Sequence, residues 1–180
     1  LAHVWDGAQA STLSARALYW VPRVPHRQRE AFEKNTRANG APDFRIHDGP
    51  GSAAAPARPL YFPLLMGEPA GRQGDQIGYD LGNNVWLLQE FLRADETGGA
   101  ILSIDRRAKT ASLIAPVQDR SGPRSETLGF VMAEYDLDAL LMPPALRGFS
   151  SQAAEVKMIL VDETVAHEHN LLLSVNLAPA

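Results

Sequence analysis

The stretch that begins at Ile77, IGYDLGNNVWLLQEFLRADETGGAILS, constrains the fold more than any other part of the chain. It opens with a short apolar run typical of a strand. Asn83 or Asn84 can then cap a helix over residues 85–96, and Gly98 stands where a left-handed C-terminal cap is expected. A second apolar run follows the glycine. A helix held this closely between two strands is expected to pack on a sheet.

The spacing of apolar residues within this helix predicts its buried face. Val85, Leu88, Phe91 and Leu92 recur at helical intervals and are expected to face the core. Asp80, just before the helix, has two interpretations: a catalytic carboxylate at the tip of a strand, or a structural cap. No partner for acid–base chemistry is identifiable from its spacing to other residues, so the pattern favours the cap.

Elsewhere the chain contains more strand signals than helix signals. Leu13, Ala17 and Trp20 form one stripe of a helix over residues 6–20, and residues 26–39 read as an exposed helix that stops at Gly40. Consecutive strands indicate an α+β fold rather than a doubly wound parallel sheet. The strands are expected at residues 44–46, 60–66, 77–81, 100–104, 111–117, 128–136, 155–162 and 171–178.

Composition and charge exclude several classes of protein. The 180-residue chain has a net charge of −4 and no cysteine, which excludes disulfides and gives no reason to expect nucleic-acid binding. The basic residues from Arg23 to Arg29 read as the solvated start of a helix. No run approaches the roughly 20 apolar residues that cross a bilayer, and the N-terminus does not read as a signal peptide. We expect a soluble domain, of a kind that can lie between two membrane helices.

Catalytic motifs are not evident. The chain has no G-x-S-x-G and no glycine-rich phosphate or dinucleotide motif. His167-Glu168-His169 resembles a metal site, because alternate residues of a strand share a face and the two histidines could hold zinc if a third ligand converged. Its other interpretation is a polar surface turn. A metal-dependent hydrolase that uses Asp80 and both histidines therefore stays an alternative, and no cofactor is expected.

Five phrases, in the same order and spacing, resemble the CHASE domain. ALYWVPRVPHRQREAFE (residues 17–33) resembles its W-x-P-x-V region with the R-x-x-F/Y-E that follows, and LYFPLLMGEP (60–69) resembles its Y-x-P-V…P strand. The stretch at residues 77–103 resembles its G-x-D…A-x-x-T-G…S block. LIAPV (113–117) and LGFVMAEYDLDALL (128–141) resemble its PV strand and its GFV strand with helix. The resemblance extends over about residues 17–141.

The resemblance implies a sensor domain. CHASE domains are the extracytoplasmic ligand-sensing parts of membrane receptors, and they precede a histidine kinase, a nucleotide cyclase, or a GGDEF or EAL module. The implied fold is α+β, with an N-terminal helix followed by two PAS-like antiparallel-sheet units. Residues 1–17 would end that helix, residues 18–139 would form the membrane-distal ligand-binding unit, and residues 140–180 would form the membrane-proximal unit.

The resemblance also implies a ligand site, with departures at its polar positions. In the cytokinin receptors of the family, an acidic residue one turn into the core helix binds the adenine-type ligand, and a threonine lines the pocket. The matching positions are the apolar Leu87 and Ile114, and Gln118 replaces the usual tyrosine after PV. A ligand amine buried against Leu87 would lose about 1–3 kcal/mol of hydrogen bonding, so we expect a ligand other than a cytokinin. The candidate ligand-binding residues are Tyr61, Asp80, Leu87, Phe91, Ser103, Ile114, Ala115 and Met132.

These observations predict the periplasmic or extracytoplasmic sensor domain of an inner-membrane receptor, which binds a small molecule and is not itself an enzyme. As the resemblance implies, we expect a homodimer formed through the N-terminal helix, and membrane attachment through flanking helices. The second candidate function is a dimerisation scaffold of the same kind of receptor that binds no ligand. The third is the hydrolase described above.

Overall fold

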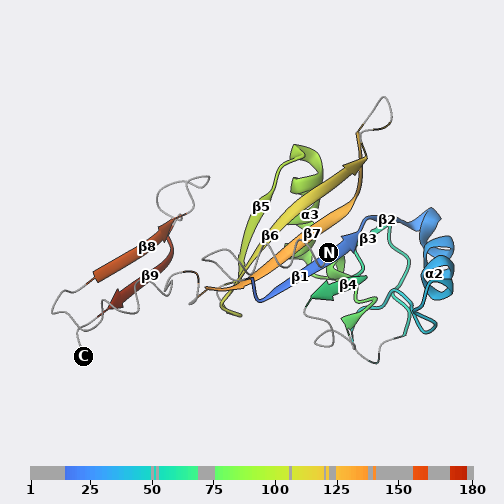
Figure 1. Cartoon of the computed structure of the whole chain (residues 1–180), viewed down its shortest axis with the longest axis horizontal. Coiled ribbons are helices and arrows are strands. Elements are labelled where there is room, and N and C mark those ends of the chain that lie inside the picture. The colour runs from blue at the N-terminus through green and yellow to red at the C-terminus, as the bar shows by residue number, and fades with distance from the viewer. Residues whose placement is uncertain are drawn as a thin grey trace. The chain divides into compact units, whose positions relative to one another are not determined.

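The computed structural model describes residues 15–49, 51, 53–68, 76–105, 107–119, 121, 125–137, 140, 156–161 and 171–177 (Figure 1). The chain divides into two compact units. One contains Ala17–Ser103 and Ser112–Ala133, and the other contains Ala2–Arg16, Ile104–Ala111 and Glu134–Ala180. In the second unit, β8 (Val156–Val161) pairs antiparallel with β9 (Leu171–Leu177). These two strands were predicted at residues 155–162 and 171–178, and both are confirmed.

Five strands form the main sheet, in the order β4-β1-β7-β6-β5. They are β1 (Ala17–Pro22), β4 (Met66–Glu68), β5 (Ile101–Asp105), β6 (Thr110–Asp119) and β7 (Glu126–Asp136). A smaller antiparallel pair joins β2 (Val24–Pro25) to β3 (Leu60–Tyr61). The described helices are α2 (Arg29–Ala38) and α3 (Val85–Thr97), with short 3-10 turns η1 (His26–Gln28) and η3 (Leu81–Asn83) before them. The predicted α+β class with antiparallel sheets is therefore confirmed.

The prediction of a helix over residues 6–20 is wrong from residue 17 onward, because the chain forms β1 there. Ala17–Pro22 is buried along its length except at Trp20, so side chains on both faces of β1 are covered. A strand covered on both faces shows no alternation, so its apolar residues can match a helical stripe by chance. Residues 1–14 lie outside the described residues, and with them lies almost all of the expected N-terminal helix.

The prediction of strands at residues 44–46 and 77–81 is also wrong. The chain makes only isolated bridges there, joining His47 to Ala54 and Tyr79, and Pro63 to Asp80. Pro63 has no N–H to donate to a ladder, and it splits the strand expected at residues 60–66 into β3 and β4. Gly78 has a φ of +90°, which breaks the extended conformation of residues 77–81.

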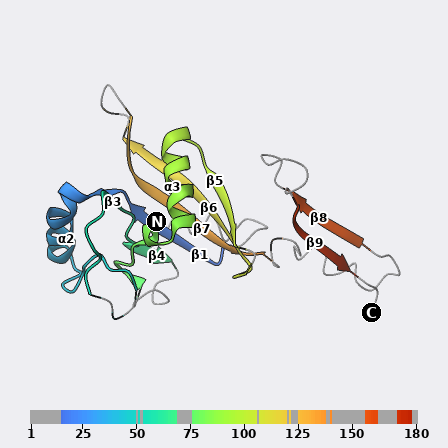
Figure 2. The same cartoon turned by 180° about the vertical axis from the view of Figure 1, so that it is seen from behind.

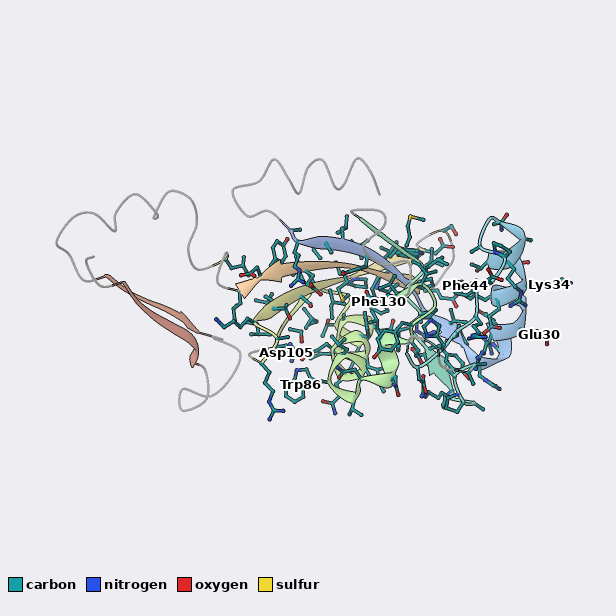
Figure 3. All side chains as sticks on the ribbon, turned by 90° about the horizontal axis from the view of Figure 1, so that it is seen from below. Glu30, Lys34, Phe44, Trp86, Asp105 and Phe130 are labelled. Carbon is teal, nitrogen blue, oxygen red and sulfur yellow. The ribbon has the colours of Figure 1, made fainter. Side chains whose placement is uncertain are left out.

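The helix α3 lies against one face of the sheet in both views (Figures 1 and 2), and the main core fills the space between them. Phe91 and Ala94 are the buried residues of α3, and Leu87 and Leu88 pack partly buried beside them. The buried face predicted from spacing is therefore wrong at two positions. Val85 is 68% exposed and Leu92 is 43% exposed. Trp86 likewise projects away from the sheet (Figure 3).

A second core cluster lies between α2 and the segments that surround it. Val24, Phe44, Ile46, Ala55 and Tyr61 form it, with Phe32 of α2 packed at its edge. The rings of Phe32 and Phe44 meet edge to face, with centroids 5.7 Å apart. Glu30 and Lys34 lie on the outer side of α2 (Figure 3). The exposed helix predicted over residues 26–39 is confirmed as η1 followed by α2, neither of which contains a buried residue.

Asn84 caps α3, as the sequence predicts, and its replacement should destabilise the first turn of the helix. Its Oδ1 accepts hydrogen bonds from the backbone N–H groups of Trp86 at 2.9 Å and Leu87 at 3.4 Å. Asn84→Ala is expected to lower the free energy of unfolding by about 1 kcal/mol, because two N–H groups lose their acceptor. Urea denaturation followed by circular dichroism measures this change. Asn84→Asp is the matched control, since it keeps the acceptor; an equal loss in both variants would contradict the capping role.

Candidate functional site

The helix α3 is positioned by signals at both of its ends. Asn84 caps its N-terminus, and Gly98 ends it with a φ of +66°, in the left-handed region where glycine is favoured. The next strand, β5, starts directly after this turn and joins the sheet at one edge. This local order places Leu87 and Phe91 over the sheet, where the candidate ligand-binding residues were predicted.

Four of the eight predicted ligand-binding residues come together at the α3 face of the sheet. Phe91, Ile114 and Met132 are buried members of one core cluster, and Leu87 packs against it partly buried. Ser103 is buried on β5. Ala115 follows Ile114 on β6, and successive strand residues point to opposite faces, so Ala115 lies on the other face of the sheet.

Aromatic rings fill the centre of this core. The rings of Phe62 and Phe91 stack with centroids 4.8 Å apart and an interplanar angle of 8°. Phe130 packs against Phe91 at 5.0 Å and against Phe62 at 5.8 Å. Phe62 and Phe130 are absent from the predicted site, although sequence reasoning had placed both in strands. The candidate residues around Phe91 therefore contact other side chains of the domain.

One carboxylate at this helix was missed by sequence reasoning. Glu90 lies one turn after Leu87, and its side chain is only 16% exposed. Its Oε2 is buried and finds no hydrogen-bond partner among the described residues. Arg93 makes an ion pair with it, with Nη2 and Oε2 3.5 Å apart. A buried carboxylate oxygen without a hydrogen-bond donor is costly, and the ion pair with Arg93 offsets part of that cost.

Tyr61 lies in the other core cluster, away from the α3 site. Its hydroxyl donates to the carbonyl oxygen of Pro56 at 3.1 Å, and it accepts from the Arg58 backbone N–H at 2.9 Å and from Arg29 Nη1 at 3.2 Å. His26 Nδ1 also lies 3.0 Å from it. One hydroxyl can take part in three such bonds, so residues of the same domain occupy the full hydrogen-bonding capacity of Tyr61. These bonds connect α2 to the loop before β3.

Asp80 is fully buried, and both of its oxygens are engaged. Oδ1 accepts from the backbone N–H groups of Phe62 at 2.8 Å and Gly82 at 3.0 Å, and Oδ2 accepts from Arg58 Nη1 at 2.8 Å. Arg58 also binds Asp48 through both terminal nitrogens, at 2.7 and 2.6 Å. The hydrogen bonds to Asp48 raise the pKa of Arg58, burial lowers it, and Asp80 raises it further, for a net increase. The interpretation of Asp80 as a structural cap agrees with these contacts.

The metal hypothesis gains no support from the part of the chain that the structure describes. No group of three or more histidine, cysteine or acidic residues gathers there in a way that could hold a metal ion. His167 and His169 lie outside the described residues. The contacts of Asp80 are with N–H donors and a guanidinium, which is the setting of a structural carboxylate.

The basic segment from Arg23 to Arg29 is less solvated than predicted. Arg29 bridges Ala55 and Ile46 through their carbonyl oxygens, at 2.7 and 3.1 Å, and pairs with Glu33 at 2.9 Å. Arg23 Nε donates to Asp95 Oδ2 at 3.0 Å, which ties the end of β1 to α3. The prediction of a solvated helix start is wrong at these two positions, because their partners are far away in the sequence.

Comparison with known families decides the assignment. The family model of the CHASE domain matches residues 5–173, which is most of the chain. The chain belongs to the CHASE domain family. No curated protein sequence matches it.

CHASE domains are sensory rather than catalytic, and they are extracytoplasmic parts of signalling receptors. Neither of the two described α-helices has the length and hydrophobicity of a membrane span. In this CHASE domain, the candidate residues Leu87 and Phe91 lie on α3 at its face toward the sheet, and Glu90 is a neighbouring acid of the same helix.

Proposed function

We propose that this CHASE domain is the ligand-sensing part of an inner-membrane receptor, which binds a small molecule in the periplasm or outside the cell. It passes the signal to a cytoplasmic histidine kinase or cyclic-di-GMP module. The observation that carries the proposal is the family match over residues 5–173. In this proposal, residues 18–139 form the membrane-distal PAS-like unit and residues 140–180 belong to the membrane-proximal one. The receptor dimerises through its N-terminal helix.

The ligand site in this proposal lies on the α3 face of the sheet. Leu87, Phe91, Ile114 and Met132 supply apolar surface, and most ligand pockets are built mainly from such residues. The buried Oε2 of Glu90 supports the proposal further, because it has an ion-pair partner in Arg93 but no hydrogen-bond donor among the described residues, and a ligand N–H would donate to it. The role of Glu90 was not predicted, because an acid among other charged residues of a helix reads as solvent-exposed.

A thermal-shift screen of the purified domain against a metabolite library tests the proposal. A compound present at about 100 times its Kd should raise the melting temperature by roughly 5–10 °C, because it binds the folded state alone. Glu90→Gln should remove most of this shift. Glu96→Gln is the matched control, since Glu96 is an exposed acid on the same helix. The absence of any hit among purines, amino acids and aromatic acids would count against the proposal.

The second candidate function, a dimerisation scaffold without a ligand, is favoured by one observation. Phe62, Phe91 and Phe130 fill the core beneath α3 with ring-to-ring contacts. A ligand that entered there would have to displace this packing. The scaffold hypothesis predicts a dimer whose melting temperature does not change with any compound in the library. The same screen therefore distinguishes a scaffold from a ligand sensor.

A further inference from the structure

A groove lies on the first compact unit, at the point where β1 leads into α2. Its volume is about 220 Å³. Residues 22–25, Gln28 and Phe32 form one side, and residues 126–128 at the start of β7 form the other. The backbone N–H of Arg23 donates to the carbonyl oxygen of Leu128 at 3.0 Å, which holds the two sides together. The groove shares no lining residue with the predicted ligand site at α3.

Arg23 supplies the positive charge of the groove. Its Nε is held by Asp95 at 3.0 Å, with the two side chains 29% and 24% exposed. Within the described part of the chain, its terminal nitrogens have no hydrogen-bond partner. A guanidinium fixed on one edge keeps its other N–H groups in a planar arrangement that matches a carboxylate. Asp95 thus orients Arg23 and leaves donors available.

The opposite side of the groove supplies a negative charge and apolar surface. Glu126 is exposed, and it forms no ion pair with any residue that the structure describes. Leu128 is 51% exposed although it lies in the sheet, and it lines the groove together with Phe32. A carboxylate acceptor, a carboxylate-binding donor and an apolar wall in one small groove are the features that recognise a zwitterion with an apolar side chain.

We propose that this groove binds a free α-amino acid. Its carboxylate lies on Arg23, its ammonium group lies near Glu126, and its side chain packs on Phe32 and Leu128. The groove is smaller than the roughly 300–1,000 Å³ of pockets for drug-sized ligands, which suits a molecule of this size. The site is separate from the α3 site, so it adds a second ligand class to the proposed sensor and does not rest on the first.

Isothermal titration calorimetry of the purified domain tests the inference. The twenty standard amino acids are titrated first, and the best binder is compared with its two analogues that lack either the ammonium or the carboxylate group. For L-leucine these are 4-methylpentanoate and 3-methylbutylamine. We expect saturable binding of at least one amino acid and about tenfold weaker binding of both analogues, because each loses a charged contact.

Two variants locate the site. Arg23→Gln should weaken binding of the amino acid by about tenfold or more. Glu126→Gln should weaken binding of the amino acid but leave binding of the carboxylate analogue unchanged, since that analogue has no ammonium group. Arg27→Gln is the control for Arg23→Gln, because Arg27 is an exposed arginine of the same segment that does not line the groove; it should bind within about threefold of the wild type.

Two results would overturn the inference. One is that no amino acid binds at concentrations up to about 10 mM, where even a weak site would fill. The other is that Arg23→Gln binds as tightly as the wild type. A compound whose thermal shift survives in Arg23→Gln and disappears in Glu90→Gln binds at the α3 site, so the two variants distinguish failure of the groove from failure of the α3 site.

Discussion

Replacing Phe91 with alanine is expected to lower the free energy of unfolding by about 3–5 kcal/mol. Phe91 is fully buried, and its ring stacks on Phe62 at 4.8 Å and packs against Phe130 at 5.0 Å. The substitution removes apolar surface and leaves a cavity under α3 that the two remaining rings cannot close. Urea denaturation of the purified domain, followed by circular dichroism, measures the loss.

Leu92→Ala is the matched control for this prediction. Leu92 is the next residue of the same helix but is 43% exposed, so its loss should cost less than about 1 kcal/mol. Comparable losses in the two variants would contradict the buried face assigned to α3. A large effect at Phe91 alone would show that its ring packing is a main contribution to the stability of the domain.

The helix α3 and its boundaries could be predicted because the signals for them are local. Asn84 accepts hydrogen bonds from N–H groups two and three residues later, and Gly98 adopts a positive φ at the helix end. Both effects act within one turn and depend little on the rest of the chain. The strands β6 and β7 were also predictable, because each is a long run with few breaks.

The buried face of α3 could not be predicted as reliably. The stripe from Val85 to Leu92 has the correct period, but period alone does not say which side of a helix meets the sheet. Ala94 is completely buried, yet alanine carries a weak hydrophobic signal. The sheet contact selects the face that contains Leu87 and Ala94, and that contact depends on β7, which comes much later in the chain.

The polar contacts of the site were not predictable, because their partners are far apart in the sequence. Arg23 and Asp95 are separated by 72 positions. Arg58 lies in a segment that reads as a loop from its Gly, Pro and Ala content, and nothing nearby indicates that it reaches Asp80 across 22 positions. Charged residues in such segments are usually solvated, so only the folded structure distinguishes a buried ion pair from an exposed charge.

Replacing Asp80 with alanine is expected to lower the free energy of unfolding by about 3–5 kcal/mol. The carboxylate is fully buried, and its loss leaves the N–H groups of Phe62 and Gly82 without their acceptor and removes one of the two carboxylates that neutralise Arg58. Gly82 lies in η3, just before α3, and Phe62 directly follows β3, so the turn that leads into the helix loses its connection to that segment. Urea denaturation measures the free energy, and circular dichroism at low denaturant reports the helix.

Asp48→Asn separates the role of burial from the role of charge at the same guanidinium. Asp48 also binds Arg58, at 2.6 Å, but its side chain is 26% exposed, so its loss should cost about 1 kcal/mol or less. If Asp80→Ala and Asp48→Asn cost the same, the buried hydrogen bonds to Phe62 and Gly82 would contribute little, and Asp80 would be an ordinary ion-pair partner. If Asp80→Ala costs several times more, its carboxylate acts chiefly as the acceptor that fixes the chain before α3. In that case a ligand could reach Asp80 only by competing with donors of the domain itself, and the proposed ligand site would depend on Leu87 and Glu90 of the helix instead.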